Sequence, residues 1–82
     1  MIKAKDIKAI LLQIPSGTTL DLSQIKKFLQ NNLYLTKEDW EPHTKTRLTN
    51  YPKWLHKTQG VLSEYKRNGK IKHNSQMHTY TF

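Results

Sequence analysis

The segment from Pro52 to Gly69 constrains the fold most, because it carries a start signal, an end signal and one continuous apolar face of a helix. Pro52 suits the first turn, where a missing N–H costs nothing, and Asn68-Gly69 can form a left-handed C-terminal cap. Between these ends, the side chains expected inside fall within about 120° of arc at 100° per residue. They are Trp54, Leu55, Thr58, Val61, Leu62 and Tyr65. The spacing predicts a long helix with one face in a core and the other outside.

Two shorter apolar patterns precede this helix. Ile7, Ile10, Leu11 and Ile14 stand at i, i+3, i+4 and i+7, which predicts a first helix that Pro15-Ser16-Gly17 ends. The β-prone residues 18–20 then predict one short strand.

Capping signals mark two further helices. Asp21 and Gln24 form a capping box ahead of a second apolar face, on a helix that should end near Asn31-Asn32. That face consists of Leu22, Ile25, Phe28 and Leu29. Thr36 and Asp39 repeat the signal, but Pro42 limits this third piece to little more than a turn, because proline pushes the preceding residue out of the α region. Residues 43–50 show no period and are predicted to be an irregular loop.

The C-terminal residues alternate as a β-hairpin does. Residues 70–73 and 77–82 read as two short strands around Asn74-Ser75-Gln76, with His78, Tyr80 and Phe82 on one face. The order of elements is helix, short strand, helix, helical turn, long helix and hairpin. It predicts a single α+β domain over residues 1–82, a winged helix-turn-helix with three main helices, a short strand and a C-terminal β-hairpin wing.

Several motifs carry a family resemblance. The chain has Leu-Thr-x-x-Asp-Trp at its third helical piece, an Arg before Tyr-Pro-x-Trp, and then Val-Leu-x-x-Tyr-Lys-x-x-Gly-Lys-Ile. With these motifs residues 36–73, about half the chain, resemble the N-terminal winged-helix domain of Mrr-type restriction endonucleases and related modules. The resemblance implies DNA binding through the helix that starts near Pro52, in a restriction-modification or transcription-regulation context. It does not imply nuclease activity, which in that family lies in a separate domain. Tyr65 stands where leucine is more usual.

Charge is concentrated in the C-terminal half. The net charge is +8. Residues 1–41 hold six Lys against five carboxylates, whereas residues 42–82 hold six Lys and two Arg against Glu64 alone. Such an asymmetry favours a polyanionic partner. On the outer face of the long helix, Lys and Arg can hold phosphates, Gln and Ser can bind base edges, and Gly60 would let a phosphate backbone come close. The candidate DNA-binding residues are Arg47, Lys53, His56, Lys57, Gln59, Ser63, Arg67, Lys70, Lys72, His73 and Gln76.

Other classes of function find little support in the residues. There is no cysteine, the four histidines lack the spacing of a zinc site, and neither the serines nor the carboxylates form a catalytic arrangement. We therefore expect no enzyme, no metal, no cofactor, no small-molecule substrate and no membrane span, in a cytoplasmic protein. The alternative function is a protein-interaction adaptor that docks an acidic surface. An RNA partner, an additional protein domain and a homodimer also stay open.

Overall fold

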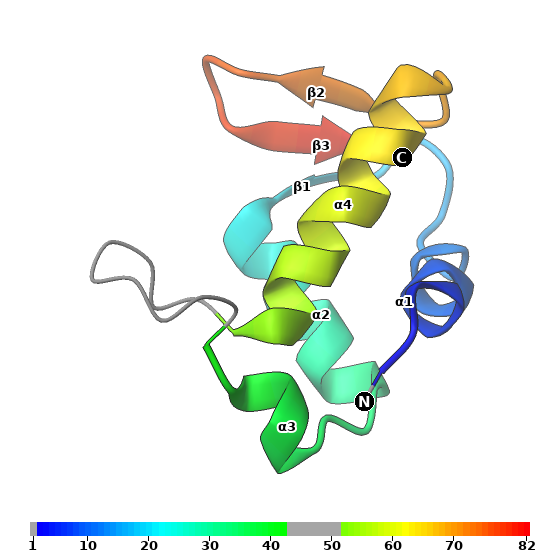
Figure 1. The fold of residues 1–82 in the computed structure, drawn as a ribbon. Helices are drawn as coiled ribbons and strands as arrows, with labels where there is room; N and C mark the ends of the chain where they lie inside the picture. Colours follow the sequence, from blue (N-terminus) through cyan, green and yellow to red (C-terminus); the bar gives the residue numbers. More distant parts are fainter. Residues whose placement is uncertain (1, 43–51) are drawn as a thin grey trace.

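The computed structural model describes residues 2–42 and 52–82, which form an α+β fold of four helices and a three-stranded antiparallel sheet (Figure 1). Its elements in chain order are α1 (Ala4–Leu11), β1 (Thr19–Asp21), α2 (Leu22–Asn32), α3 (Lys37–Trp40), α4 (Lys53–Arg67), β2 (Lys72–Asn74) and β3 (Thr79–Thr81). The order expected from the sequence is thus confirmed for the described residues.

The capping interactions that the sequence predicted at the starts of α2 and α3 are formed. Asp21 accepts the Gln24 amide at 2.8 Å, and the Gln24 side chain accepts the Asp21 amide at 2.9 Å. Thr36 and Asp39 form the same reciprocal box at the start of α3. In α4, Pro52 is the N-cap, one place before the helix rather than in its first turn, and Gly69 adopts φ 74° after its end. Local capping therefore fixes the starts of α2 and α3 and the end of α4 as predicted, whereas α4 begins one residue later than expected.

The first helix is shorter than its apolar pattern suggested. α1 ends at Leu11, and the next turn closes with tighter i→i+3 bonds, from Gln13 N–H to Ile10 and from Ile14 N–H to Leu11. Pro15 explains this, because it disfavours α conformation at Ile14. Ile14 nevertheless stays buried, while Leu12 is 78% exposed.

The sheet joins the segment after α1 to the C-terminal hairpin. Its strand order is β1-β3-β2, with Leu20 paired to Tyr80 and His73 paired to Tyr80 on the other side. Both hairpin strands are shorter than predicted. His78 adopts φ 54° before β3 begins and is exposed, so its predicted place on the face of Tyr80 and Phe82 is wrong.

The core lies between α4, α1 and α2. Of the residues expected there, Ile7, Leu11, Ile14, Ile25, Trp54, Val61, Leu62 and Tyr65 are buried. Ile10, Leu22 and Phe28 are only partly buried, because they lie at the edge of the packed faces. Leu29 and Leu55, which also lie on the predicted inner faces, are buried as well, and Ile2 and Ile71 complete the buried apolar residues of the described chain. Trp54 is 1% exposed and packs edge-on to Trp40 with ring centroids 5.5 Å apart, so it is part of the core and not a surface for stacking bases.

A buried carboxylate fastens the N-terminal segment to α3. Asp39 is fully buried and accepts the Ile2 amide at 2.8 Å, the Thr36 amide at 2.9 Å and the Thr36 hydroxyl at 3.0 Å. Burial raises the pKa of Asp39, but the hydrogen bonds from Thr36 and Ile2 outweigh it and hold the pKa below its ordinary value. The Ile2 carbonyl accepts from the Lys57 ammonium at 2.9 Å. The peptide groups of Ile2 are therefore held between α3 and α4.

Candidate nucleic-acid interface

The outer side of α4 is an accessible polar stripe. His56, Gly60, Ser63 and Arg67 are exposed, and Lys53, Lys57 and Gln59 are partly exposed at its borders. All six predicted contact residues of the helix are therefore accessible, opposite the buried row of Trp54, Val61 and Leu62. The amphipathic period thus separates a packed face from a face that a partner can reach. We call the seven accessible residues the outer stripe: Lys53, His56, Lys57, Gln59, Gly60, Ser63 and Arg67.

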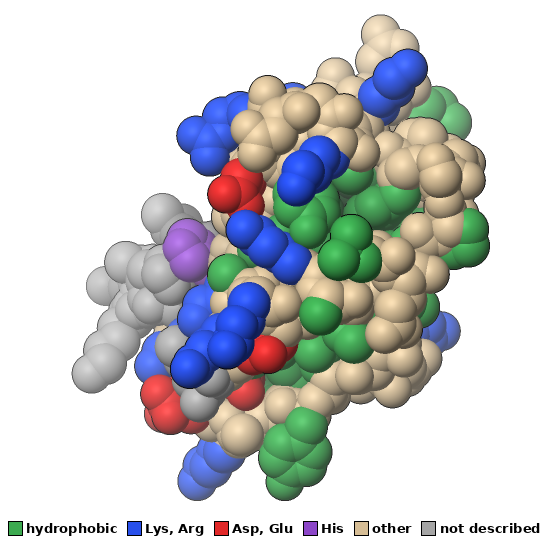
Figure 2. Space-filling view, turned by 90° about the vertical axis from the view of Figure 1, so that its right-hand side faces the viewer, with side chains coloured by type: hydrophobic (Ala, Val, Ile, Leu, Met, Phe, Trp, Pro, Cys, Tyr) green, Lys and Arg blue, Asp and Glu red, His purple; other side chains and the backbone are tan. Residues whose placement is uncertain are grey.

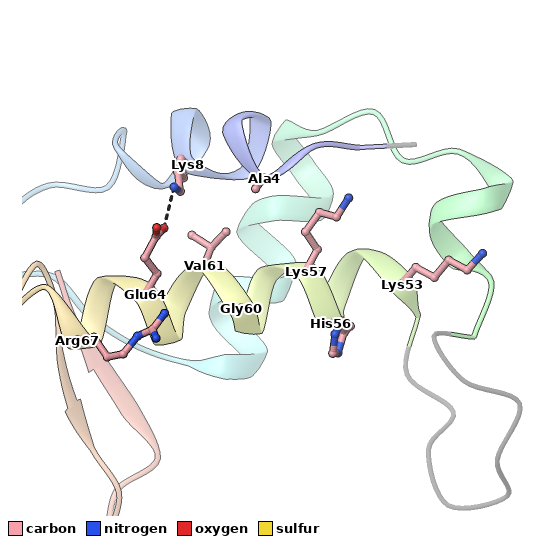
Figure 3. A pocket seen from close by; sticks show the side chains of 9 residues that line it. All are labelled: Ala4, Lys8, Lys53, His56, Lys57, Gly60, Val61, Glu64 and Arg67. Atoms are coloured by element: carbon pink, nitrogen blue, oxygen red, sulfur yellow. Dashed lines mark ion pairs between the residues drawn. The ribbon is translucent and has the colours of Figure 1, made fainter.

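One side of the outer stripe borders a groove between α1 and α4 (Figure 3). The groove has a volume of about 560 Å³. Of the nine described residues that line it, four are Lys or Arg and one is a carboxylate: Ala4, Lys8, Lys53, His56, Lys57, Gly60, Val61, Glu64 and Arg67. In the view onto α1, Lys and Arg side chains are spread over the visible face, with several carboxylates lying between them (Figure 2). We call this feature the α1–α4 groove.

Three lysines of the α1–α4 groove have partners within the chain. Lys8 pairs with Glu64 at 2.7 Å, and Lys53 pairs with Glu41 at 3.5 Å. Lys57 donates to Ile2, so its ammonium is directed toward the N-terminal segment, whereas His56 points to the opposite side of the helix (Figure 3). These three ammonium groups keep their positive charge, but a phosphate would have to compete with their present partners to bind them.

The Lys8–Glu64 pair is fully ionised at neutral pH. The hydrogen bond from Lys8 lowers the pKa of Glu64, with Lys70 and Arg67 adding to the effect at longer range. The same hydrogen bond raises the pKa of Lys8. Both side chains are well exposed, at 38% and 42%, so the pair adds little to stability.

The other side of the outer stripe meets the hairpin at a smaller niche of about 220 Å³. Its lining includes Gln59 and Ser63 from α4 and His73 from β2. All three are candidate DNA-binding residues predicted from the sequence. His73 stacks on Tyr80 with ring centroids 4.6 Å apart. It therefore faces its cross-strand partner Tyr80.

The hairpin carries the remaining predicted residues. Lys70, Lys72 and Gln76 are exposed, and the Lys70 ammonium lies 5.1 Å from the centroid of the Tyr65 ring. The Asn74 side chain accepts the amides of Gln76 and Met77, both at 3.1 Å, which fixes the turn. A basic and locally ordered hairpin thus stands beside the outer stripe.

Sequence reasoning missed two basic residues of this surface. Lys66 lines the niche with Gln59 and Ser63, and its i+3 spacing from Ser63 could have shown this. Lys8 lies in α1, and no local pattern connects it to Glu64, because that contact depends on how the two helices pack. Arg47, His43 and Tyr51 lie outside the described residues.

Other kinds of site are not evident in the described residues. Within 2–42 and 52–82, no group of three or more His, Asp or Glu side chains is placed to hold a metal ion. Over the same ranges, none of the helices combines the length and the apolar character needed to cross a bilayer.

Comparisons of the chain with protein-family models, curated proteins and solved structures give no match. The features that bear on function are therefore the geometry and chemistry of the outer stripe, the α1–α4 groove and the hairpin.

Proposed function

We propose that this chain is a double-stranded-DNA-binding winged-helix domain, with α4 as its recognition helix and the β2–β3 hairpin as its wing. It would act as a small regulator or as the targeting module of a larger assembly. The observation that carries the proposal is the outer stripe of α4, which is exposed, polar and flanked by Lys and Arg on the α1 side and by the hairpin on the other. The sheet order and the resemblance of residues 36–73 to Mrr-type winged-helix domains are consistent with it.

The shape of this surface favours duplex DNA. The major groove of B-DNA admits an α-helix, whereas the deep, narrow major groove of duplex RNA does not. Ser63 at the crest of the outer stripe and Gln59 at its edge would face base edges. Lys72 and Arg67 would meet phosphates, the contacts that supply most affinity and little sequence information.

The adaptor alternative is less well supported by the same surface. Interface centres are rich in Tyr, Trp, Met and Arg, whereas the outer stripe contains no large apolar side chain. The large exposed apolar residues of the described chain lie elsewhere: Leu12, Tyr34, Trp40 and Met77. A protein partner would have to bind the charged stripe through its own acidic groups.

One titration tests the proposal directly. Fluorescence anisotropy would be measured with labelled random duplex DNA, single-stranded DNA and duplex RNA, each at low and at physiological salt. We expect duplex DNA to bind most tightly, with an affinity that falls as salt rises, because phosphate contacts release counterions. No binding to duplex DNA at low salt would overturn the proposal and leave the adaptor alternative.

Two substitutions separate phosphate contacts from base contacts. Lys72→Gln should weaken binding to all duplexes alike and reduce the salt slope by about one unit, because it removes one phosphate contact. Gln59→Ala should instead reduce the preference between sequences, by about 1–3 kcal/mol for a preferred site selected from a random library. Identical behaviour of the two variants would show that Gln59 reads no base.

Gly60 provides a test in which stability and binding change in opposite directions. A Cβ built at Gly60 meets nothing within 4 Å, and glycine inside a helix is unfavourable. Gly60→Ala should therefore raise the free energy of unfolding by about 0.5–1 kcal/mol, measured by urea denaturation. If DNA approaches α4 closely at this point, the same variant should bind duplex more weakly. A gain in stability with unchanged binding would mean that the DNA lies farther from the helix axis.

A further inference from the structure

We propose that the α1–α4 groove holds one strand of the DNA phosphodiester backbone, and that the Glu64 carboxylate occupies a phosphate position in it by pairing with Lys8. DNA binding would then require Lys8 to exchange the carboxylate for a phosphate. This inference rests on the proposed function and extends the interface to α1, a helix that the sequence did not connect with binding.

The length and sign of the α1–α4 groove fit a linear polyanion better than a single small anion. Its lining runs along α4 from Lys53 to Arg67, a rise of about 21 Å at 1.5 Å per residue. A strand of DNA backbone that follows the groove carries several phosphates over that length, whereas a single small anion would occupy only part of it. Lys8 stands across from α4 and supplies positive charge from the opposite wall (Figure 3).

Two of the residues that line the α1–α4 groove are small. Ala4 on α1 and Gly60 on α4 both line it, with Val61 between the two helices. A Cβ added at Gly60 would still meet nothing within 4 Å. A sugar-phosphate chain can therefore approach the two helices without displacing a large side chain.

Glu64 has the surroundings that a bound phosphate would have. Its carboxylate lies 2.7 Å from the Lys8 ammonium, and the positive charges of Lys70 and Arg67 also lower its pKa. It is the one carboxylate among the described residues that line the groove. Both side chains of the pair are exposed, so a phosphate can replace the Glu64 carboxylate at Lys8 without leaving a buried charge. Glu64 thus weakens DNA binding in two ways, by repelling the phosphates and by engaging Lys8.

The experiment is a double-mutant cycle on duplex binding, with one labelled duplex measured from low to physiological salt. The variants are Glu64→Gln, Lys8→Gln and the double variant, and Glu38→Gln on α3 is the control with the same change in net charge outside the groove. Circular dichroism melts confirm that each variant is folded.

We expect Glu64→Gln to bind about 3- to 10-fold more tightly at low salt, and to steepen the salt slope by up to about one unit, because Lys8 becomes available to a phosphate. Adding Lys8→Gln should abolish both gains, and should cost more in the Glu64→Gln background than in the wild type. At physiological salt Glu38→Gln should change the affinity less than about 2-fold, because surface charges beyond a Debye length of about 8 Å are screened.

Four results would overturn the inference. Equal gains in Glu64→Gln and Glu38→Gln would show a general charge effect, and a gain that survives Lys8→Gln would show that Lys8 contacts no phosphate. Wild-type binding that Glu64→Gln leaves unchanged would remove the α1–α4 groove from the interface while leaving the proposed function intact. If neither the wild type nor Glu64→Gln binds duplex at low salt, the proposed function fails and the inference fails with it.

Discussion

Leu62→Ala should lower the free energy of unfolding by about 2–5 kcal/mol, the usual range for truncating a buried leucine. Leu62 is 2% exposed and lies in the middle of the buried row of α4, in the same core as Ile7 and Ile25. Removing its side chain loses apolar burial and leaves a cavity that the surrounding helices fill only in part. Urea denaturation followed by tryptophan fluorescence would measure the change, because Trp54 is in the same core.

The neighbouring residue provides the control for this prediction. Ser63 is the next residue of α4 and is exposed on the outer stripe, so Ser63→Ala should change stability by less than about 0.5 kcal/mol. The pair of variants tests which side of α4 is inside, on which the whole assignment of the interface depends. Equal losses in both variants, or no loss in Leu62→Ala, would show that the buried face is wrongly assigned.

Asp39→Ala should lower the free energy of unfolding by about 2–4 kcal/mol at neutral pH, because it removes a helix cap and leaves one buried and one partly buried amide without this acceptor. The amides belong to Ile2 and Thr36, and the carboxylate that accepts them is fully buried. Asp6 occupies the corresponding capping position in α1, where its carboxylate accepts the Lys3 amide at 2.9 Å in an exposed setting. Asp6→Asn should therefore cost only about 0.5–1 kcal/mol.

The Asp39 interaction also predicts a dependence on pH. Its hydrogen bonds hold the pKa of the folded state below the ordinary value of 3.8, so the unfolded chain takes up the proton first as the pH falls. The stabilisation is therefore complete above about pH 4 and is lost as the pH falls through the lower pKa of the folded state. Asp39→Asn cannot titrate, and the stability difference between wild type and Asp39→Asn should shrink over that acid range. A difference that stays constant down to pH 2 would show that the folded and unfolded states take up this proton equally, so that folding does not lower the pKa of Asp39.

Asp39 also matters for the proposed interface. Its bond to the Ile2 amide and the bond of Lys57 to the Ile2 carbonyl hold the same short segment between α3 and α4. That segment leads directly into α1, which supplies Lys8 to the α1–α4 groove. We therefore expect loss of Asp39 to disturb the groove before it disturbs the hairpin.

Much of the fold could be predicted because its signals are local. The capping boxes at Asp21 and Thr36 and the left-handed cap at Gly69 involve residues within a few positions of one another. The period of α4 separates its buried row from the outer stripe by helix geometry alone. For that reason the sequence could propose His56, Ser63 and Arg67 as outward residues, and the structure places them at the surface. The exception is α1. Its apolar spacing runs to Ile14, but the helix ends at Leu11 because Pro15 disfavours the α conformation in the residue before it.

The sequence by itself thus determined where most helices begin and end and which side of α4 faces outward. Tertiary structure alone decided that β1 pairs with β3, that Asp39 holds Ile2, and that Lys8 meets Glu64. The physical reason is range. A cap or a helical face is set by backbone geometry over three to seven residues, whereas contacts between residues dozens of positions apart exist only after helices and strands have packed. The outer stripe belongs to the first kind and could be predicted from the sequence, whereas the α1–α4 groove belongs to the second and could not.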